Sequence, residues 1–142
     1  MNLDEAIAFA RDRHFGVLAT IRRDGRPQLS NIVYSIADDG IARISITDDR
    51  AKTRNLRRDP RAQLYVVGDS FWRYVVLDGT VELTPIAADP EDTVVDELVE
   101  LYRSLSGEHP DWHEYRAAMV NDKRLVARLR PTHAYGLLPP ET

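Results

Sequence analysis

The sequence predicts an α+β protein whose strands form an antiparallel β-barrel with flanking helices. Two observations support this fold class. Five segments with the apolar, β-branched character of strands follow one another with only one short helical segment between them. The other helical segments stand near the two ends of the chain, whereas regular alternation with strands would favour a doubly wound parallel sheet. With 142 residues, the chain is expected to form one domain over residues 1–142.

The first half of the chain contains one expected helix and three expected strands. Asn2 can cap a helix over residues 2–13, because Glu5 follows three residues later and apolar side chains recur at helical spacing. Apolar, β-branched runs predict strands over residues 16–21, 28–35 and 41–47. Asp-Gly steps at residues 24–25 and 39–40 supply the turns between these strands.

A short helix and two more strands are expected next. Helix-forming residues over 51–59 stop at Pro60, which cannot continue a helix. Strand-like runs follow over residues 62–67 and 71–83. The second run contains Asp78-Gly79, and a glycine inside a strand often marks an irregularity in the pairing.

The C-terminal part predicts two helices and two closing strands. The first helix begins at Asp89-Pro90, with the proline at the first helical position, and its apolar face ends before Gly107. A second helix is expected over residues 111–121. The closing strands are expected over residues 125–130 and 133–138, separated by Pro131.

The segment from Arg50 to Arg61 is the strongest functional signal in the sequence. It holds six of the 19 basic residues and one acid, Asp59, so it carries +5, while the rest of the chain, with 13 basic and 22 acidic residues, carries −9. The segment begins where a strand turns into a helix, and a helix N-terminus presents unpaired N–H groups and the positive end of the helix dipole. Arg50 and Lys52 add full charges there, so we predict a phosphate site.

Composition excludes several classes of function. The net charge of −4 argues against a dedicated nucleic-acid binder, and the absence of cysteine excludes thiol chemistry and fits a reducing compartment. No window of the sequence approaches the roughly 18 apolar residues of a membrane span, and the N-terminus lacks the basic and apolar regions of a signal peptide. We therefore expect a cytoplasmic protein that binds neither nucleic acid nor membranes.

Seven motifs, spread over nearly the whole chain, identify a known superfamily by their order. They are Gly16-Val-Leu-Ala-Thr-Ile, Asp24-Gly-Arg-Pro-Gln-Leu-Ser-Asn, Ser45-Ile, Arg50-Ala-Lys-Thr-Arg-Asn-Leu-Arg-Arg-Asp-Pro-Arg, Glu82-Leu-Thr-Pro, Leu101-Tyr-Arg and Tyr135-Gly-Leu. Together they resemble the flavin/deazaflavin oxidoreductase superfamily, which has the split β-barrel fold and includes the pyridoxamine 5′-phosphate oxidases. The Arg-Ala-Lys-Thr-Arg-Asn run is most similar to the mycobacterial-type branch, which binds the deazaflavin coenzyme F420 as a homodimer.

The resemblance implies where the cofactor phosphate would bind. Arg50, Lys52 and the backbone at Ala51 would hold it, and Asn55 would assist. Arg54, together with Arg57 and Arg58, would stand near the anionic oligoglutamate tail of coenzyme F420. The spacing of these later arginines also fits a solvated helix face, so both interpretations stay open.

The resemblance also implies contacts with the ring system of the cofactor. Gln28, Ser45 and Ile46 would lie along the deazaflavin and its linker. Trp72 and Tyr74 belong to a segment that, in the family, reaches the cofactor from the second subunit of a homodimer. As residues of an expected strand, neighbours such as Phe71 and Trp72 would face opposite sides of the sheet.

The expected function is that of a coenzyme F420-dependent oxidoreductase that transfers hydride from the reduced deazaflavin to a conjugated organic substrate. The alternatives are an FMN-dependent enzyme of the pyridoxamine-phosphate-oxidase type and a non-catalytic carrier of F420 or flavin. Because the sequence has no nucleophile motif and no cysteine, the redox chemistry would belong to the cofactor. No catalytic residue is assigned, and Tyr34, Tyr74 and solvent stay open as proton donors.

Three weaker signals are interpreted without a catalytic role. His109 and His113 are four residues apart, but Pro110 places His109 outside the helix, so no metal site is expected. His133 is interpreted as a packed or surface histidine. The sequence has no Gly-x-Gly-x-x-Gly run, which disfavours a Rossmann nicotinamide site.

Overall fold

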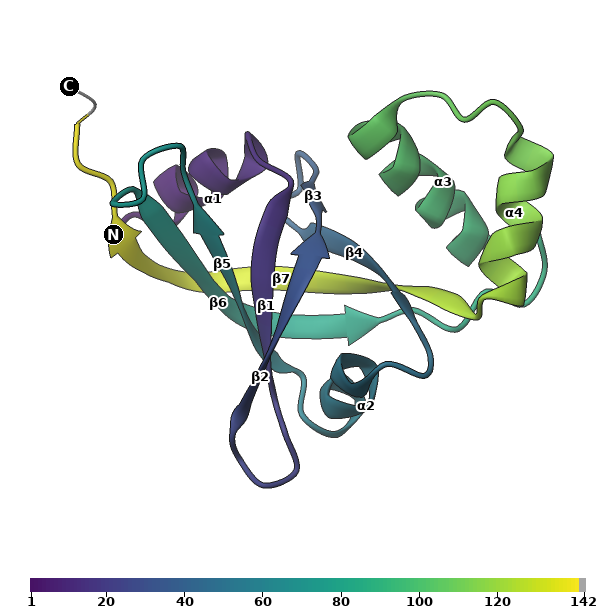
Figure 1. The fold of residues 1–142 in the computed structure, drawn as a ribbon, viewed down its shortest axis with the longest axis horizontal. Coiled ribbons are helices and arrows are strands. Elements are labelled where there is room, and N and C mark those ends of the chain that lie inside the picture. Colours follow the sequence, from purple (N-terminus) through teal and green to yellow (C-terminus); the bar gives the residue numbers. More distant parts are fainter. Residues whose placement is uncertain (141–142) are drawn as a thin grey trace.

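One curled antiparallel sheet forms the body of the protein. The computed structural model describes residues 1–140, in which seven strands pair in the order β2-β1-β5-β6-β7-β4-β3, each antiparallel to its neighbours. The elements are α1 (Leu3–Arg11), β1 (Phe15–Ile21), β2 (Pro27–Val33), β3 (Ser35–Ile36), β4 (Ala42–Thr47), α2 (Ala51–Arg58), β5 (Arg61–Val67), β6 (Tyr74–Leu83), α3 (Thr93–Ser106), α4 (Trp112–Asn121) and β7 (Arg124–Leu137). Figure 1 shows the sheet wrapping into a half barrel with α1 and α2 at opposite ends. The predicted α+β split β-barrel is confirmed.

The barrel closes because two strands that are consecutive in the sequence lie at opposite edges of the sheet. β2 and β3 are these edge strands, and only Tyr34 joins them. Tyr34 is fully buried; its N–H donates to the carbonyl of His14 (2.8 Å) and its hydroxyl donates to the carbonyl of Ala10 in α1 (2.7 Å). The single strand predicted over residues 28–35 is therefore two strands, with a buried tyrosine at the turn.

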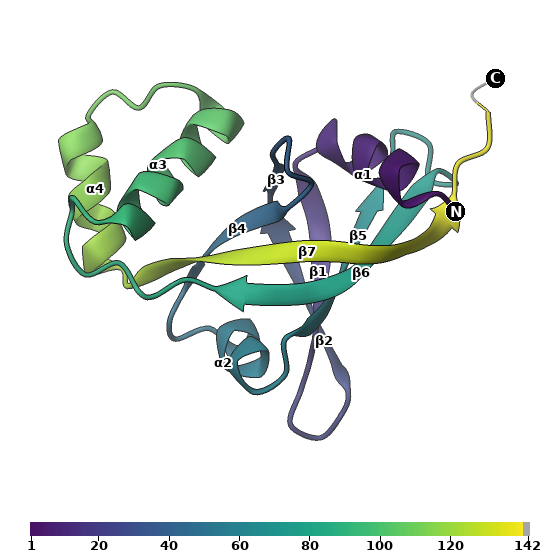
Figure 2. The same ribbon diagram turned by 180° about the vertical axis from the view of Figure 1, so that it is seen from behind.

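Two apolar cores stabilise the structure. The main core lies inside the curled sheet, where Leu18, Leu64 and Leu77 are in register across β1, β5 and β6 and fully buried. A smaller core joins α3 and α4 to the outer side of β7 at Val126. Figure 2 shows this α3–α4 hairpin standing beside the barrel, and a groove separates it from β2 and β4.

A β-bulge lets β7 run through a proline. Gly79 pairs with Pro131 and Asp78 pairs with His133, so Thr132 is the additional residue on β7. Proline inside a sheet is tolerated at such a bulge because the pairing is already interrupted there. A Cβ atom at Gly79 would lie 2.1 Å from the carbonyl oxygen of Arg130, so this position accepts only glycine. The irregularity predicted at Asp78-Gly79 is confirmed, and the two predicted closing strands are one.

The starts of α3 and β6 differ from the prediction by three residues each. α3 begins at Thr93, not at Pro90, because the side chain of Asp92 caps it by accepting the N–H of Val95 (2.8 Å). β6 begins at Tyr74, and residues 68–73 form a tight loop closed by a hydrogen bond from the N–H of Gly68 to the carbonyl of Arg73 (2.7 Å). Within residues 1–140, no helix combines the length and apolar character needed to cross a membrane.

Candidate functional site

The N-terminus of α2 presents positive charge without a compensating cap. Arg50 occupies the N-cap position, its side chain makes no capping hydrogen bond, and the first turn contains no acidic residue. The N–H groups at this end, beginning with Ala51 and Lys52, have no intrahelical acceptor. The hydroxyl of Thr53 donates to the carbonyl of Thr47 (2.7 Å), which fixes the helix start against the end of β4. A fixed helix end with basic side chains is suited to bind an anion.

A second cation, Arg124, lies beside this helix end although it is distant in the sequence. Arg124, at the start of β7, is in register with Thr47, and its Nη1 lies 3.4 Å from the hydroxyl of Ser45 and 3.5 Å from the carbonyl of Ser45. The Nε of Arg124 is buried and, among residues 1–140, has no hydrogen-bond partner. Because a buried N–H group without an acceptor is costly, a ligand oxygen is its natural partner.

Lys52 shares this environment. Burial, followed by the positive charges of Arg50 and Arg124, lowers the pKa of Lys52 below its ordinary value. Within the described part of the chain, no carboxylate lies within ion-pair distance of Lys52 or Arg124. An anion bound between them would remove the repulsion that lowers this pKa.

Lys52 and Arg124 line a groove of about 380 Å³ between the barrel and the α3–α4 hairpin. Its remaining walls are mostly apolar: Asn31, Ile32 and Val33 of β2, Ile44 and Ser45 of β4, Leu101, Tyr102 and Leu105 of α3, and Tyr115 and Met119 of α4. The hydroxyl of Tyr115 donates to the carbonyl of Leu98 (3.0 Å), which fixes this aromatic wall.

The groove continues across the edge strand onto the outer face of the sheet. A second groove, of about 290 Å³, shares Asn31 and Ile32 with the first and adds Phe15, Gly16, Val17, Tyr65 and Val67. Strand register places Asn31, Val17 and Tyr65 in one row across β2, β1 and β5. An elongated molecule could therefore place an anion at Lys52 and a planar group over Val17 and Tyr65.

Two predicted site residues, Asn55 and Gln28, connect α2 to the β1–β2 hairpin through hydrogen bonds. The Nδ2 of Asn55 donates to Gln28 Oε1 (3.1 Å) and to Thr20 Oγ1 (3.1 Å), and its Oδ1 accepts from Arg58 (3.0 Å). Asn55 is buried. These bonds tie α2 to the β1–β2 hairpin, so Asn55 and Gln28 position the helix whatever ligand it holds.

The remaining predicted residues differ in their access to the groove. Ser45 lines it, whereas the side chain of Ile46 lies in the barrel core and leaves only its backbone for a ligand. Ala51 and Arg50 are exposed at the helix start. Arg54 is exposed and donates to the carbonyl of Asp49 (3.0 Å).

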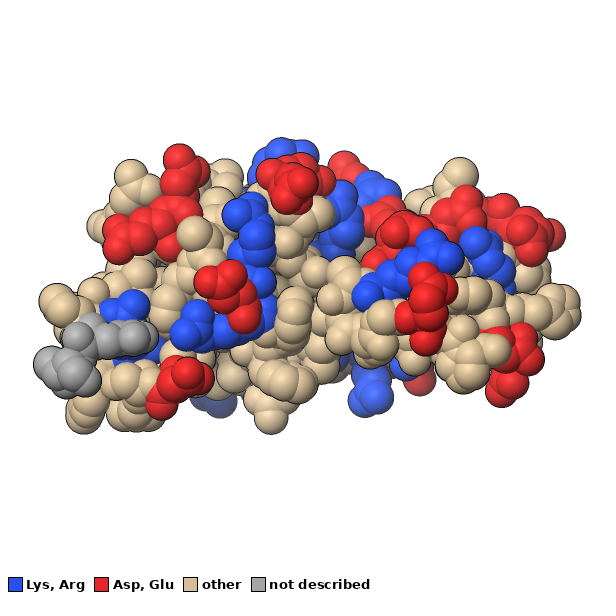
Figure 3. All heavy atoms as spheres, turned by 90° about the horizontal axis from the view of Figure 1, so that it is seen from above, with Lys and Arg blue, Asp and Glu red and all other residues tan. Residues whose placement is uncertain are grey.

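The later arginines of the basic segment already have partners in the chain. Arg57 forms an ion pair with Asp48 (2.6 Å), and Arg58 donates to the carbonyl of Ile21 (2.8 Å). On the face seen in Figure 3, basic side chains lie beside acidic ones and do not form a continuous basic surface.

Neither Trp72 nor Tyr74 lines either groove. Trp72 is in the loop before β6, 68% exposed, with its ring 5.1 Å from that of the equally exposed Phe71. The expectation that these neighbours face opposite sides of a strand is wrong, because the loop presents both together. Tyr74 lies on β6, and its ring is 5.7 Å from that of Tyr65.

The structure also describes one candidate proton donor, Tyr34, and the two histidines beside Pro110. Tyr34 is excluded as a proton donor because it is fully buried, its hydroxyl is bonded to Ala10, and burial raises its pKa. The Nδ1 of His109 accepts the N–H of Asp111 (2.9 Å), while His113 is exposed. In the part of the chain that the structure describes, no group of three or more potential ligand side chains is arranged to hold a metal.

Comparison with known proteins gives consistent results. A family model described as pyridoxamine 5′-phosphate oxidase matches residues 3–137. The conserved hypothetical protein Rv2991 from Mycobacterium tuberculosis is 26% identical, with a TM-score of 0.71 over 94% of this chain and 82% of that chain. A protein named F420 reductase is 28% identical, with a TM-score of 0.67 over 89% of this chain and 94% of that chain. A heme binding protein from Mycobacterium smegmatis, 22% identical with a TM-score of 0.68 over 93% of this chain and 52% of that chain, shares the fold.

Proposed function

The chain belongs to the pyridoxamine 5′-phosphate oxidase family, and from this premise we propose that it is a coenzyme F420-dependent oxidoreductase that reduces a conjugated organic substrate. One observation carries the proposal. Lys52 and Arg124 line one groove beside the uncapped N-terminus of α2, and no carboxylate of residues 1–140 is paired with them. The similarity to an F420 reductase supports the choice of cofactor.

The groove suits the phosphate of such a cofactor. Arg50, Lys52 and Arg124 supply charge, and the first-turn N–H groups of α2 supply directed donors. Ser45 also lines the groove, with its hydroxyl 3.4 Å from Arg124 Nη1, and this hydroxyl can contact the linker. The buried Nε of Arg124 would gain the acceptor that the protein does not provide. The residues present therefore fit a phosphate-bearing ligand.

The protein's part in the reaction is to bind, orient and exclude water. When bound, a reduced deazaflavin supplies a hydride from its C5. The apolar walls of the outer groove, including Phe15, Val17 and Tyr65, offer a surface on which a planar ring can lie. Asn55 and Gln28 hold α2 against the β1–β2 hairpin, so the phosphate anchor and this surface keep a fixed separation.

We further propose that the protein acts as a homodimer through the outer face of the sheet. Phe15, Leu29, Tyr135 and Leu137 are all between 45% and 76% exposed there, and such a broad apolar surface marks an interface. A second subunit would bring its exposed Trp72, and Tyr74 beside it, toward the grooves of the first. A monomer in light scattering at micromolar concentration would remove these two residues from the site.

FMN is the second candidate cofactor, and one observation favours it. FMN ends at its phosphate, whereas F420 continues into an anionic tail. The bonds of Arg57 to Asp48 and of Arg58 to Ile21 leave fewer free cations for such a tail. A short phosphate ligand would use the groove without them.

Paired titrations of the purified protein with F420 and with FMN test the proposal, followed by cofactor fluorescence or heat. We expect tight binding of F420 and weaker binding of FMN. Tight binding of FMN alone would move the protein to the flavin branch. Binding of neither cofactor would refute the proposed function.

A further inference from the structure

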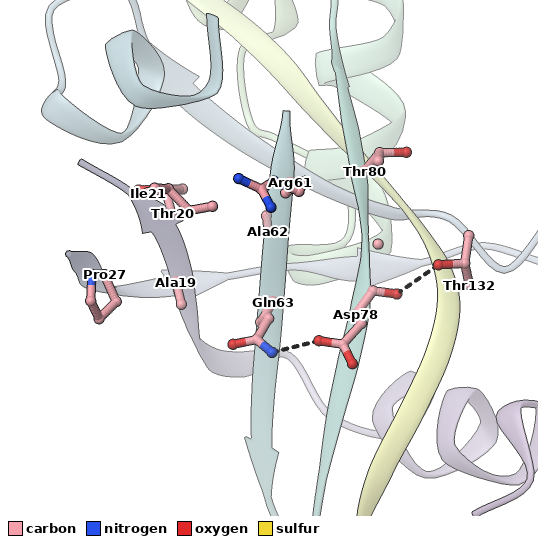
Figure 4. A pocket seen from close by; sticks show the side chains of 11 residues that line it. Ala19, Thr20, Ile21, Pro27, Arg61, Ala62, Gln63, Asp78, Thr80 and Thr132 are labelled. Atoms are coloured by element: carbon pink, nitrogen blue, oxygen red, sulfur yellow. Dashed lines mark hydrogen bonds between the residues drawn. The ribbon is translucent and has the colours of Figure 1, made fainter. Parts of the chain in front are cut away.

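We propose that the pocket drawn in Figure 4 receives the substrate and that His133, oriented by Asp78, donates the proton that completes its reduction. This inference rests on the proposed function for the source of the hydride. It assigns a proton donor, a role from which burial excludes Tyr34.

The pocket adjoins the surface assigned to the cofactor ring. It has a volume of about 410 Å³ on the outer side of the sheet. Ala19 of β1 and Gln63 of β5 line it, and each stands two residues from Val17 or Tyr65 on the same face of its strand. Two strand residues span about 6–7 Å, so a ring over Val17 and Tyr65 would border the pocket.

Asp78 connects the pocket to His133. Its Oδ2 lies 2.9 Å from His133 Nδ1, and its Oδ1 accepts from Gln63 Nε2 at 2.5 Å. Figure 4 shows Gln63 and Asp78 pointing toward each other along one side of the pocket. Strand register places Gln63, Asp78 and His133 in one row across β5, β6 and β7. The carboxylate therefore holds the imidazole by one nitrogen and leaves Nε2 for a ligand.

The β-bulge gives this row its local geometry. Thr132 is the additional residue on β7, and its hydroxyl lies 3.5 Å from the carbonyl of Asp78. Bulges are frequent beside active sites because they re-aim neighbouring side chains. Gly79 permits the close approach to β7, and no other residue fits there. A glycine-dependent bulge is thus located beside a histidine–carboxylate pair whose carboxylate, Asp78, lines the pocket.

The lining indicates the class of substrate. Ala19, Ile21, Pro27 and Ala62 provide an apolar surface, and Arg61 and Asp78 add one charge of each sign. A neutral, planar, conjugated carbonyl compound fits these features. When hydride adds to its carbon–carbon double bond, the electron pair of that bond moves toward the carbonyl oxygen. The Nε2–H bond of protonated His133 then breaks, an O–H bond forms, and solvent returns the proton to His133.

The substrate is thereby reduced by two electrons and the cofactor oxidised by two. His133 stabilises the oxyanion before it transfers its proton, and Asp78 stabilises the imidazolium. Asp78 is a positioning residue, because it acts on the substrate through His133.

A probe that needs no cofactor tests the assignment. 4-Nitrophenol is a planar conjugated phenol whose absorbance reports its ionisation to the phenolate oxyanion, and it is titrated into the purified protein. We expect the bound probe to shift toward the phenolate and His133→Ala to weaken its binding about tenfold or more, as loss of one charge-assisted hydrogen bond implies. His113→Ala, which removes an exposed histidine on α4, is the matched control and should bind like wild type. Equal binding by His133→Ala and wild type would overturn the proposal.

Three further variants separate the orientation of His133 from proton transfer. Asp78→Asn should weaken probe binding, and Asp78→Glu should restore part of it if the carboxylate acts by holding His133. His133→Gln retains a hydrogen-bond donor but no transferable proton, so it should bind the probe better than His133→Ala while losing single-turnover reduction. Full reduction by a folded His133→Gln variant would contradict the role of His133 as proton donor.

Cofactor titration separates failure of this inference from failure of the proposed function. His133→Ala should bind F420 with wild-type affinity, because His133 lies outside the phosphate groove. If the wild type binds neither F420 nor FMN, the proposed function fails, while the probe experiment still decides whether His133 serves the pocket. A His133→Ala variant that loses both probe and cofactor binding would instead overturn the separation of the two sites.

Discussion

Two clusters of basic residues in this protein differ in one respect, which is whether carboxylates accompany them. Between α3, β4 and β7, Glu97 accepts hydrogen bonds from Arg43 (3.1 Å) and Arg128 (2.9 Å), Asp39 pairs with Arg43 (2.9 Å), and Glu82 pairs with Arg128. Every cation in that network has an internal partner, so the network has no charge left for a ligand.

The cluster at the N-terminus of α2 lacks such partners. Lys52 and Arg124 converge beside Arg50 without an ion pair to any residue from 1 to 140, and burial keeps the pKa of Lys52 low. Placing like charges together costs stability unless something compensates them. The comparison teaches that arginines paired with carboxylates stabilise the fold, whereas Lys52 and Arg124, unpaired among residues 1–140, are the charges that the proposed function assigns to an anionic ligand.

The largest expected effect on stability comes from the network in which Glu97 pairs with Arg43 and Arg128. Glu97→Gln should lower the free energy of unfolding by about 2 kcal/mol, because it removes the negative charge and one of the two acceptor oxygens that two partly buried arginines share. The hydrogen bond from Arg128, then Arg43, lowers the pKa of Glu97, so this stability is present at neutral pH and is lost as the pH falls through that lowered value. Chemical denaturation at several pH values measures both, with Glu91→Gln on the surface as control.

Lys52 and Arg124, which have no carboxylate partner within residues 1–140, should contribute to ligand binding and little to stability. Arg124→Gln should weaken F420 binding about tenfold or more while changing the free energy of unfolding by less than about 0.5 kcal/mol, because no internal ion pair is broken. Titration and denaturation of the same preparation measure the two quantities. A loss of stability without a loss of affinity would show that Arg124 is structural.

The lowered pKa of Lys52 predicts a pH dependence of binding. Between that lowered value and the ordinary value of 10.5, the unfolded chain binds a proton that the ligand-free folded protein does not, so this lysine adds stability as the pH rises through the window. A bound anion favours the charged lysine. Phosphate-ligand affinity should therefore fall as the pH rises through the lowered pKa, measured by titrations from pH 7 upward. Lys52→Arg should remove this decline, since arginine stays charged.

The smallest effect concerns Arg57. Its ion pair with Asp48 is partly exposed, so Arg57→Ala should cost at most about 1 kcal/mol of stability. If the F420 tail does not displace this pair, the variant should bind F420 and FMN as the wild type does. A selective loss of F420 affinity would show that Arg57 leaves Asp48 to hold the tail.

The sequence was sufficient to predict features that depend on near neighbours. Arg50 and Lys52 could be assigned because the strand end, the helix start and the charges lie within a few residues of one another. Arg124 could not, because it reaches the site only through the pairing of β7 with β4, and no local signal sets that register. Pro131 was misjudged as a strand end because the bulge that accommodates it is formed by Gly79 on another strand.

The burial of Tyr34 and the loop that contains Trp72 could not be predicted from neighbouring residues either. Trp72 was expected in a strand, yet a hydrogen bond between Gly68 and Arg73 closes the loop and displaces it. Tyr34 offered a plausible hydroxyl in the sequence, and only the closure of the barrel shows that this hydroxyl is buried against α1. These features depend on contacts between residues far apart in the chain.

The most direct test of the central claim is the affinity of the Lys52→Ala variant for F420, compared with that of Arg23→Ala, which removes an exposed charge from the β1–β2 turn. If Lys52 holds the cofactor phosphate, Lys52→Ala should bind F420 about ten to a hundred times more weakly, as loss of one charge-assisted hydrogen bond implies. Arg23→Ala should bind F420 as the wild type does. Equal affinities of the two folded variants would contradict this role of Lys52 and leave the charges at α2 without a ligand.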